Sequence, residues 1–399
     1  MRKRFALVPV LFIPTILIQF GSTAGMAFVP LYAKQLGAPV SISAFVAALM
    51  YLGQAFADLP GGWLVHRFGE KRIMCVGAAL SLLAMIWRYW TQGIAGLALS
   101  VLLYGIGTSF VWISRMSWLK LTIDPDKRGY VMSYVGGSLR VAAILGPLVG
   151  GFVAEGLGYR SLFMVQGLLN AAALVMFMMF LPKSSNDGHP YSLSIDSALV
   201  AWRTGRRSII AAAAGISGLT ILRSARPILI SLRGDALDLG ESQIGLILFA
   251  GAALDAGLFW ISGIVMTRSG RKTAAVACTA ILTTALIFLP AAQGLPGLLL
   301  LSLLAGFGNA MGAGINLTIS GDLAPSYSPA AFLSFWRFSM GAAGFGGPAL
   351  AAWAIGIAGF GAAPLLIGTM GLAGAAVMAR FMKETRPDFR RTGNPEIHQ

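Results

Sequence analysis

Charged residues are scarce in this chain of 399 residues. Asp, Glu, Lys and Arg make up 11% of it, whereas 56% of the residues are hydrophobic. Soluble domains carry roughly 25% charged residues. So few charges do not cover the surface of two or three soluble domains, which excludes a soluble protein of this size. The composition instead indicates a polytopic membrane protein.

Residues for redox, metal and hydrolytic chemistry are few as well. Cys75 and Cys278 are the only cysteines and both fall in apolar segments, which excludes a disulfide framework and a cysteine metal site. We interpret them as small core residues. The three histidines are scattered, and neither a Walker motif, H-E-x-x-H nor G-x-S-x-G occurs. We therefore expect no metal, no cofactor and no enzyme activity.

The hydrophobic residues gather into twelve segments that are long enough to cross a bilayer, which takes about 20 residues. The first follows Arg2-Lys3-Arg4 and is too long for a cleaved leader, so we expect a spanning helix there. The sequence thus predicts an all-α integral membrane protein. The predicted spans are 8–32, 41–65, 72–91, 95–119, 130–155, 160–181, 208–232, 242–266, 273–292, 296–320, 329–356 and 361–381.

The net charge of +15 predicts an orientation rather than nucleic-acid binding. Most of the basic residues fall in the tails and in the loops on the N-terminal side of the predicted spans, and such loops stay in the cytoplasm. We therefore expect a multi-pass protein of the cell membrane with both termini in the cytoplasm. Its expected partners are the lipid bilayer, a small solute and protons, with no nucleic acid, and we expect a monomer.

The two halves of the chain repeat each other. A polar stretch over 183–207 reads as a cytoplasmic linker between six-span halves, 1–182 and 208–399, the second ending in a short basic tail. A shift of 201 positions, without a gap, superposes the halves. It pairs Leu36, Ser41, Gly62, Arg67, Gly69, Lys71, Gly105, Gly107, Gly146 and Pro147 with Leu237, Ser242, Gly263, Arg268, Gly270, Lys272, Gly306, Gly308, Gly347 and Pro348. Parallel repeats of this kind are typical of transporters whose halves rock about a midplane site.

Two motifs resemble those of a known family. The loop after the second span contains Gly62, His66, Arg67, Gly69 and Lys71, and Gly263 to Lys272 repeats the pattern. It resembles the G-x-x-x-D-R-x-G-R-K signature of the major facilitator superfamily. The resemblance covers the whole chain and implies a secondary transporter of two six-helix bundles. Gly69 suits a turn, and the basic residues are placed to bind helix C-termini and anionic lipid.

The second motif is Gly146-Pro147-Leu148-Val149-Gly150-Gly151 in the fifth span. It is similar to the G-P-x-x-G-G motif of that superfamily's drug:proton antiporters, which implies an exporter. Alternatively, it is a packing kink without a role in the direction of transport.

This chain departs from the family pattern in two places. His66 and Thr267 replace the acidic loop residue, and Val101 replaces an arginine of the antiporter fourth helix. His66 either titrates in place of the acid or is a polar residue at the headgroup level.

Charged side chains inside the spans are the most informative residues, because an ionised group at the bilayer centre costs at least ~2.5–3.5 kcal/mol. Their depths, counted from the helix ends along the helix rise, match in pairs. In the fold that the resemblance implies, helix 2 faces helix 11 and helix 5 faces helix 8. We therefore predict the ion pairs Asp58–Arg337 and Asp255–Arg140 as proton-coupling gates. Alternatively, each pair is a static bridge that fixes helix register.

Three more arginines lie in the spans, Arg115, Arg223 and Arg226, so that the five arginines outnumber the two aspartates. A positive cavity favours anionic or zwitterionic solutes. Arg115 and Arg226 are alternatively placed to reach the helix ends. The predicted substrate-binding residues are Arg140, Arg223, Arg115, Gln19, Tyr104, Trp112, Asn309 and Asn316. Alternatively, any of the last five makes a helix–helix hydrogen bond or a packing contact.

We therefore predict a secondary active transporter that exports a small amphipathic, anionic or zwitterionic organic solute by alternating access, coupled to proton entry. One alternative is an importer or facilitator of an organic anion. An alternative of another class is a membrane sensor or scaffold that transports nothing.

Overall fold

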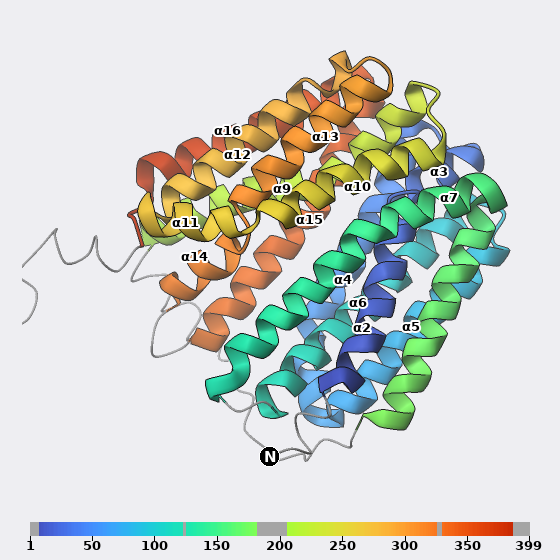
Figure 1. Ribbon diagram of the computed structural model, residues 1–399, viewed down its shortest axis with the longest axis horizontal. Helices are drawn as coiled ribbons and strands as arrows, with labels where there is room; N and C mark the ends of the chain where they lie inside the picture. Colours follow the sequence, from blue (N-terminus) through green and yellow to red (C-terminus); the bar gives the residue numbers. More distant parts are fainter. Residues whose placement is uncertain (1–7, 123–124, 182–205, 325–328, 386–399) are drawn as a thin grey trace, which may run out of the picture. The chain divides into compact units, whose positions relative to one another are not determined.

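The computed structural model describes residues 8–122, 125–181, 206–324 and 329–385 (Figure 1). These residues form α-helices and one 3₁₀ turn, without a strand. The helices before the linker are α2 (Val8–Met26), α3 (Val29–Gln35), α4 (Val40–Phe68), α5 (Glu70–Trp90), α6 (Ile94–Thr122) and α7 (Pro125–Phe180). Those after it are α9 (Arg206–Ala236), α10 (Glu241–Leu258), α11 (Trp260–Arg268), α12 (Arg271–Ile287), η1 (Leu289–Ala291), α13 (Gly294–Met311), α14 (Ile315–Leu323), α15 (Pro329–Ala358) and α16 (Ala362–Phe381). The linker predicted over 183–207 lies outside the described residues except for the start of α9.

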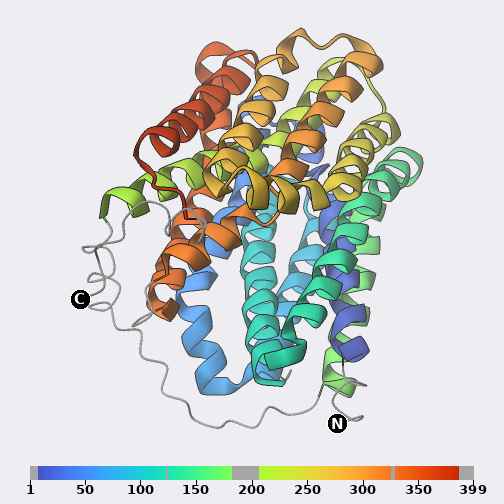
Figure 2. The ribbon, with the colours of Figure 1, turned by 60° about the vertical axis from the view of Figure 1, so that its left-hand side comes forward.

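The described helices account for all twelve predicted spans. Within the described ranges, ten helical stretches are long and apolar enough to cross a membrane, or eleven if the bent pair α2 and α3 is one span. One stretch, Leu139–Phe180, contains parts of both the fifth and the sixth predicted spans. Gly158, where φ is 81°, is not helical and divides α7 into these two spans. The two limbs of α7 are antiparallel to each other (Figure 2). The predicted all-α membrane fold is confirmed.

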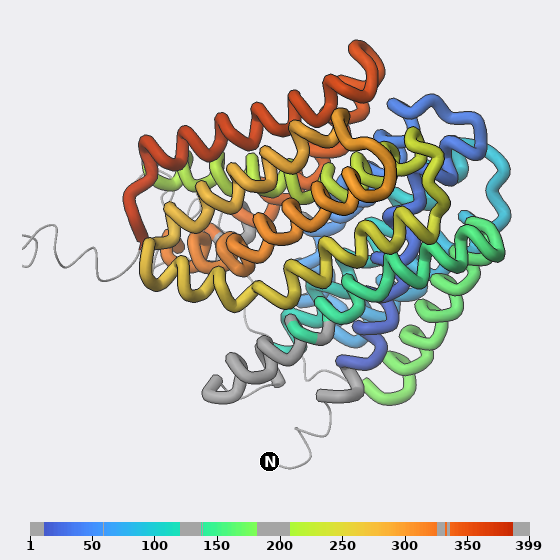
Figure 3. Tube along the Cα trace, turned by 45° about the horizontal axis from the view of Figure 1, so that its top comes forward, coloured from blue at the N-terminus to red at the C-terminus, as the bar shows by residue number. Residues whose placement is uncertain are grey.

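The chain forms two compact units. The first comprises residues 1–191 and 227–249, and the second comprises 192–226 and 250–399. In the first unit α2 packs against α7, and α6 packs against both α4 and α5. In the second unit α12 packs against α16 and α13, and the tube in Figure 3 shows α12 and α16 side by side. The division of the sequence into halves at 182 and 208 stays a prediction.

Backbone turns recur at positions that the repeat pairs. Gly69 and Gly270, which precede α5 and α12, have φ of 84° and 95°. Gly158 and Gly359 have φ of 81° and 78°. These left-handed values favour glycine because it has no Cβ. The predicted turn role of Gly69 is confirmed, and the repeat holds in the backbone as well as in the sequence.

Three predicted spans are not continuous helices. The first span bends by 43° between α2 and α3. The eighth breaks at Phe259, between α10 and α11, and the tenth breaks at Gly312–Gly314, between α13 and α14. We expected single helices over 8–32, 242–266 and 296–320, and that expectation is wrong at these points. A hydropathy profile does not reveal such breaks, because the stretches stay apolar across them. The glycines at 312 and 314 gave no warning either, because glycine is common in membrane helices.

Candidate transport site

Asp58 is held within its own unit by a neutral donor. It lies half-buried on α4, and the Ser109 hydroxyl of α6 donates a hydrogen bond to its Oδ1. One turn earlier on α4, Gln54 Nε2 donates to Thr108 Oγ1 at 3.4 Å. Asp58 and Gln54 are four residues apart and so share one face of α4. This face carries a polar seam between α4 and α6.

Asp255 has a corresponding place in the second unit. It lies half-buried on α10, and Asn309 Nδ2 of α13 donates to its Oδ2 at 2.8 Å. The repeat pairs Asp255 with Gln54 and Asn309 with Thr108. The same helix–helix contact therefore occurs in both halves, with an acid in the second and a neutral amide in the first. Both intramembrane carboxylates accept hydrogen bonds from neutral donors, which replace part of the water that burial removes.

Two arginines of α9 bind backbone carbonyl groups of the tenth predicted span. Arg223 Nη2 donates to the Gly312 carbonyl oxygen at 2.9 Å, and Arg226 Nη1 donates to that of Ala305 at 3.3 Å. Cys278 Sγ lies 3.7 Å from Arg223 Nη2. The second unit thus concentrates two guanidinium groups and a carboxylate around the broken helix.

The other predicted charged residues lie on separate helices. Arg140 of α7 and Arg337 of α15 are half-buried. Arg115 of α6 is 3% exposed, and its guanidinium lies 4.2 Å from the centre of the Trp112 ring. The alternative that Arg115 extends to the helix end is therefore wrong, because this side chain packs on an aromatic ring inside the protein. The predicted pairs Asp58–Arg337 and Asp255–Arg140 would each join the two units, and they stay predictions.

The remaining predicted substrate residues differ in exposure. Gln19 is half-buried on α2, and Trp112 is 37% exposed. Tyr104 is fully buried in the first unit. Asn316 accepts a hydrogen bond from Trp336 Nε1 at 2.7 Å, so it connects α14 to α15. Substrate contact by these residues stays a prediction.

The loop motif binds the C-terminal end of α7 in the first unit. Lys71 Nζ donates to the carbonyl oxygen of Met178 at 2.9 Å and to that of Leu181, at the end of α7. The prediction that this loop binds a helix C-terminus is confirmed. His66 and Arg67 are exposed, and the Arg67 guanidinium lies over the Trp63 ring, 5.2 Å from its centre.

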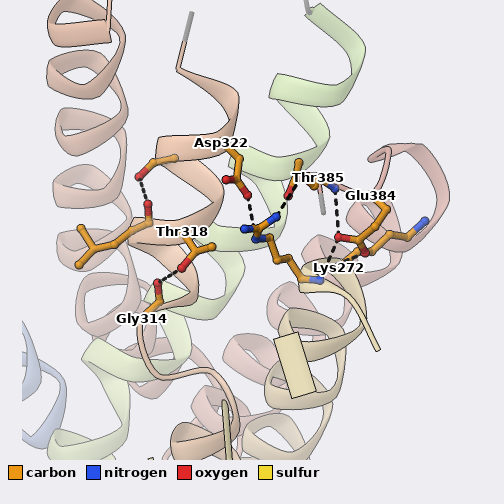
Figure 4. Close-up of polar contacts among 9 residues, drawn as sticks. Lys272, Gly314, Thr318, Asp322, Glu384 and Thr385 are labelled. Atoms are coloured by element: carbon orange, nitrogen blue, oxygen red, sulfur yellow. Dashed lines mark hydrogen bonds and ion pairs between the residues drawn. The ribbon is translucent and has the colours of Figure 1, made fainter. Parts of the chain in front are cut away.

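The second copy of the motif repeats this contact. Lys272 Nζ donates to the Met382 carbonyl oxygen at 3.2 Å, directly after α16. Arg271 pairs with Asp322 at 2.9 Å and donates to the Thr385 carbonyl oxygen at 3.0 Å. Figure 4 shows the contacts to Asp322 and Thr385, together with the Glu384 carboxylate, which accepts bonds from the first backbone N–H groups of α12.

The glycines of the fifth-span motif allow close helix approach. A Cβ at Gly146 would clash with the Thr23 hydroxyl of α2, and one at Gly150 would clash with the Ala24 carbonyl oxygen. Thr23 Oγ1 donates to the Ala142 carbonyl oxygen at 3.0 Å. On another side, a Cβ at Gly245 of α10 would clash with the Pro147 carbonyl oxygen. The motif therefore packs two neighbouring helices against α7 inside the first unit.

Arg88 is a buried cation that sequence reasoning missed. Its place next to a predicted span end suggested a loop edge, but its side chain is fully buried in α5. Nε donates to Ser100 Oγ at 3.2 Å, and the guanidinium lies 5.0 Å from the centre of the Phe163 ring and 5.6 Å from that of Tyr104. The sequence offered no usable signal, because nothing in it places Phe163 and Tyr104 beside Arg88.

Polar contacts also gather at the opposite end of the first unit from the loop motif. Lys34 pairs with Asp235, and Tyr159 donates to Glu241 Oε1 at 2.6 Å. The Ser242 backbone N–H donates to Glu155 Oε2 at 2.7 Å. These contacts hold the ends of α9 and α10 against α3 and α7.

Two repeated sets of spans with carboxylates and arginines inside them define a class of protein, the membrane transporters built from two helix bundles. The family model of the Major Facilitator Superfamily matches residues 11–234 and again residues 208–396. The chain therefore belongs to the major facilitator superfamily.

Curated relatives are similar over part of their length. The quinolone resistance protein NorA of Staphylococcus aureus is 28% identical over 44% of this chain and 46% of its own length. The probable anion transporter 6 of Arabidopsis thaliana is 27% identical over 38% of this chain and 29% of its own. The MFS-type transporter ppzB of Metarhizium rileyi is 25% identical over 36% and 29%. In each case, the match spans less than half of the relative.

Solved structures show the same fold at low identity. A POT family transporter in complex with a thioalcohol-conjugated peptide has a TM-score of 0.77 at 14% identity, covering 93% of this chain and 95% of its own. The peptide transporter POT in complex with sulfate also has a TM-score of 0.77, at 15% identity, with 93% and 92% covered.

Proposed function

We propose that this protein couples proton entry to the export of a small anionic or zwitterionic organic solute by alternating access. The proposal depends chiefly on Asp255, a half-buried carboxylate on α10 that accepts a hydrogen bond from Asn309 at 2.8 Å. A carboxylate inside a membrane span is energetically costly, so such residues usually have a function. Proton relays in membrane proteins are built from them.

The expected solute class follows from the arginines. Arg223 and Arg226 lie in the same unit as Asp255, and both reach the backbone of α13 or the break that follows it. A guanidinium remains charged and binds carboxylates and phosphates through paired N–H donors. An excess of guanidinium groups therefore favours an anionic group on the solute and disfavours simple cations.

The direction of transport is supported by the fifth-span motif and by some relatives. Gly146 and Pro147 belong to a motif that resembles one of drug:proton antiporters, and relatives include a quinolone resistance protein and a multidrug export protein. An importer or facilitator of an organic anion is the second candidate, because a probable anion transporter is among the relatives. We place the protein in the cell membrane as a monomer with both termini cytoplasmic.

A vesicle assay tests the proposal. Inside-out membrane vesicles that contain the protein are energised with a proton gradient and offered a panel of radiolabelled organic anions and zwitterions. We expect at least one solute to accumulate inside, and a protonophore to abolish the accumulation. Uptake that equilibrates without accumulating, unchanged by the protonophore, contradicts proton-coupled export and favours the facilitator.

The coupling pairs are part of the proposal. We propose that Asp255 pairs with Arg140 and Asp58 with Arg337 in one of the alternating states, and that protonation of the aspartate releases the pair. Loss of one partner of a buried pair costs ~3–5 kcal/mol, which is enough to change the balance of states. We expect Asp255→Arg with Arg140→Asp to fold but to transport without coupling. Full coupled transport by this double variant would make the pair a static bridge.

A further inference from the structure

The break in the tenth span has no counterpart in the first half. The corresponding helix α6 runs unbroken from Ile94 to Thr122, whereas α13 ends at Met311 and α14 begins at Ile315, with Gly314 at φ 77° between them. Carbonyl groups at the end of a helix lack intrahelical partners and must be satisfied from elsewhere. The Gly312 carbonyl oxygen accepts one local bond, from the Ile315 backbone N–H at 3.2 Å. Its second lone pair and the Ala313 carbonyl group are left for ligands from other helices.

Side chains from two other helices provide these ligands. Arg223 Nη2, from α9, donates to the Gly312 carbonyl oxygen at 2.9 Å, and Ser262 Oγ, from α11, donates to that of Ala313 at 2.8 Å. A cation at the C-terminal end of α13 also complements the negative end of the helix dipole. Arg223 thus stabilises the end of α13 at the break.

Glycine at 312 is required while Arg223 occupies this place. A Cβ there would lie 2.9 Å from Arg223 Nη2 and would clash with Cys278 Sγ of α12. The repeat pairs Arg223 with Ser22, Gly312 with Val111 and Cys278 with Gly77. None of the three residues recurs in the first half, so the arrangement is specific to the broken helix.

The Arg223 guanidinium has an N–H donor that is not used in a hydrogen bond to the described residues. Arg223 is half-buried, and its Nε has no hydrogen-bond partner in the part of the chain that the structure describes. A guanidinium carries five N–H donors, and an oxyanion accepts two of them in a fork. Because an oxyanion carries a full charge, it is a stronger acceptor than the neutral Gly312 carbonyl group.

We propose that Arg223 is an oxyanion-binding residue that locks the break between α13 and α14. A carboxylate or similar oxyanion that binds the guanidinium draws it away from the Gly312 carbonyl oxygen, and α14 is then free to move relative to α13. The proposal rests on the proposed function only in taking the transported solute as the source of the oxyanion, because an inorganic oxyanion presents the same chemistry.

Cys278 provides a reporter for this lock. Its side chain is fully buried, and its sulfur lies 3.7 Å from Arg223 Nη2. In full-length Cys75→Ser protein in lipid nanodiscs, Cys278 becomes the single cysteine, and its alkylation by N-ethylmaleimide is followed over time. We expect slow alkylation in sodium chloride and several-fold faster alkylation in sodium sulfate at equal ionic strength, because sulfate competes for Arg223.

Variants of Arg223 separate the lock from a general salt effect. In Arg223→Gln, which weakens the bond to Gly312 and removes the charge that binds sulfate, we expect fast alkylation in both salts. In Arg223→Lys, which keeps the charge, we expect slow alkylation in chloride. Slow alkylation of Arg223→Gln in chloride, or acceleration by sulfate that persists in that variant, would overturn the proposal.

A further arm identifies the source of the oxyanion. Organic anions that the vesicle assay finds to be transported are added in place of sulfate. Faster alkylation at their transport concentration supports the solute as the ligand, and no change in rate overturns that part of the proposal. The alkylation assay involves no flux or proton gradient, so a failure of proton-coupled export and a failure of the lock are seen in separate measurements.

Discussion

At the scale of single residues, the clearest repeated contact is that of the two loop lysines. Lys71 donates to the Leu181 carbonyl oxygen and Lys272 to that of Met382, and the repeat pairs both the donors and the acceptors. A cation at a helix C-terminus stabilises it by typically about 0.3–1 kcal/mol, and by up to ~2 kcal/mol where it is partly buried. The loop motif therefore has a structural role in each half, whatever further part it has in transport.

Neutral replacement of these lysines tests this role. We expect Lys71→Met and Lys272→Met each to lower the free energy of unfolding by about 1 kcal/mol, through loss of the bonds to the end of α7 or the end of α16. Thermal unfolding of the protein in detergent measures the change. Lys34→Met is a control at the other end of the first unit, because Lys34 makes its ion pair with a side chain at the surface and such pairs contribute about 0–1 kcal/mol. Unchanged stability in both loop variants would contradict this role.

The sequence allowed some single residues to be placed correctly and others not. Turn glycines such as Gly69 follow from the repeat, because the same backbone requirement occurs twice. The partners of Asp58 and Asp255 do not, since Ser109 and Asn309 are polar residues among many in apolar spans. Arg88 was missed because a cation close to a predicted span end suggests a loop, and only packing against Phe163 shows that it is buried.

At the scale of helices, close crossings recur between corresponding elements. A Cβ at Gly105 of α6 would clash with the Met50 carbonyl oxygen of α4, and one at Gly306 of α13 would clash with the Gly251 carbonyl oxygen of α10. The repeat again pairs the two glycines with each other and the two acceptors with each other. Small residues let membrane helices approach closely, which is the main source of helix association in lipid.

Alanine at these crossings tests their importance. We expect Gly105→Ala and Gly306→Ala each to destabilise the protein by about 1–3 kcal/mol, because the added methyl group pushes two backbones apart. Gly137→Ala in α7 is the matched control, since among the described residues no atom outside its own helical turn lies within 4 Å of a Cβ there. That change should leave stability unchanged or raise it slightly, because alanine favours helix. Equal melting temperatures for all three variants would contradict close packing at the crossings.

Helix continuity was the feature of the elements least accessible from the sequence. The breaks at Phe259 and at Gly312–Gly314 lie inside apolar stretches whose hydropathy suits an unbroken span. Gly61 and Ile113 occupy the corresponding places of Ser262 and Gly314 in the first half, so the repeat also gave no warning. The break depends on ligands such as Arg223 from other helices, and the sequence does not show which side chains meet.

At the scale of the whole molecule, the repeat organises both the fold and the site. Two halves that pair Gln54 with Asp255 and Thr108 with Asn309 build the same contact with different chemistry. Asp255 lies in the half whose tenth span is broken, while the first half carries Asp58 one turn further along. Such asymmetry within a repeated fold is consistent with a transporter in which the two bundles have different tasks.

The most direct test of proton coupling follows protons rather than the solute. Purified protein is reconstituted into liposomes that contain a pH-sensitive dye, and a gradient of a transported organic anion is imposed. We expect solute-driven proton flux in the wild type and in Asp322→Asn, whose carboxylate pairs with Arg271. We expect loss of that flux in Asp255→Asn, in Asp58→Asn or in both. Wild-type proton flux in both aspartate variants would contradict proton coupling through these carboxylates.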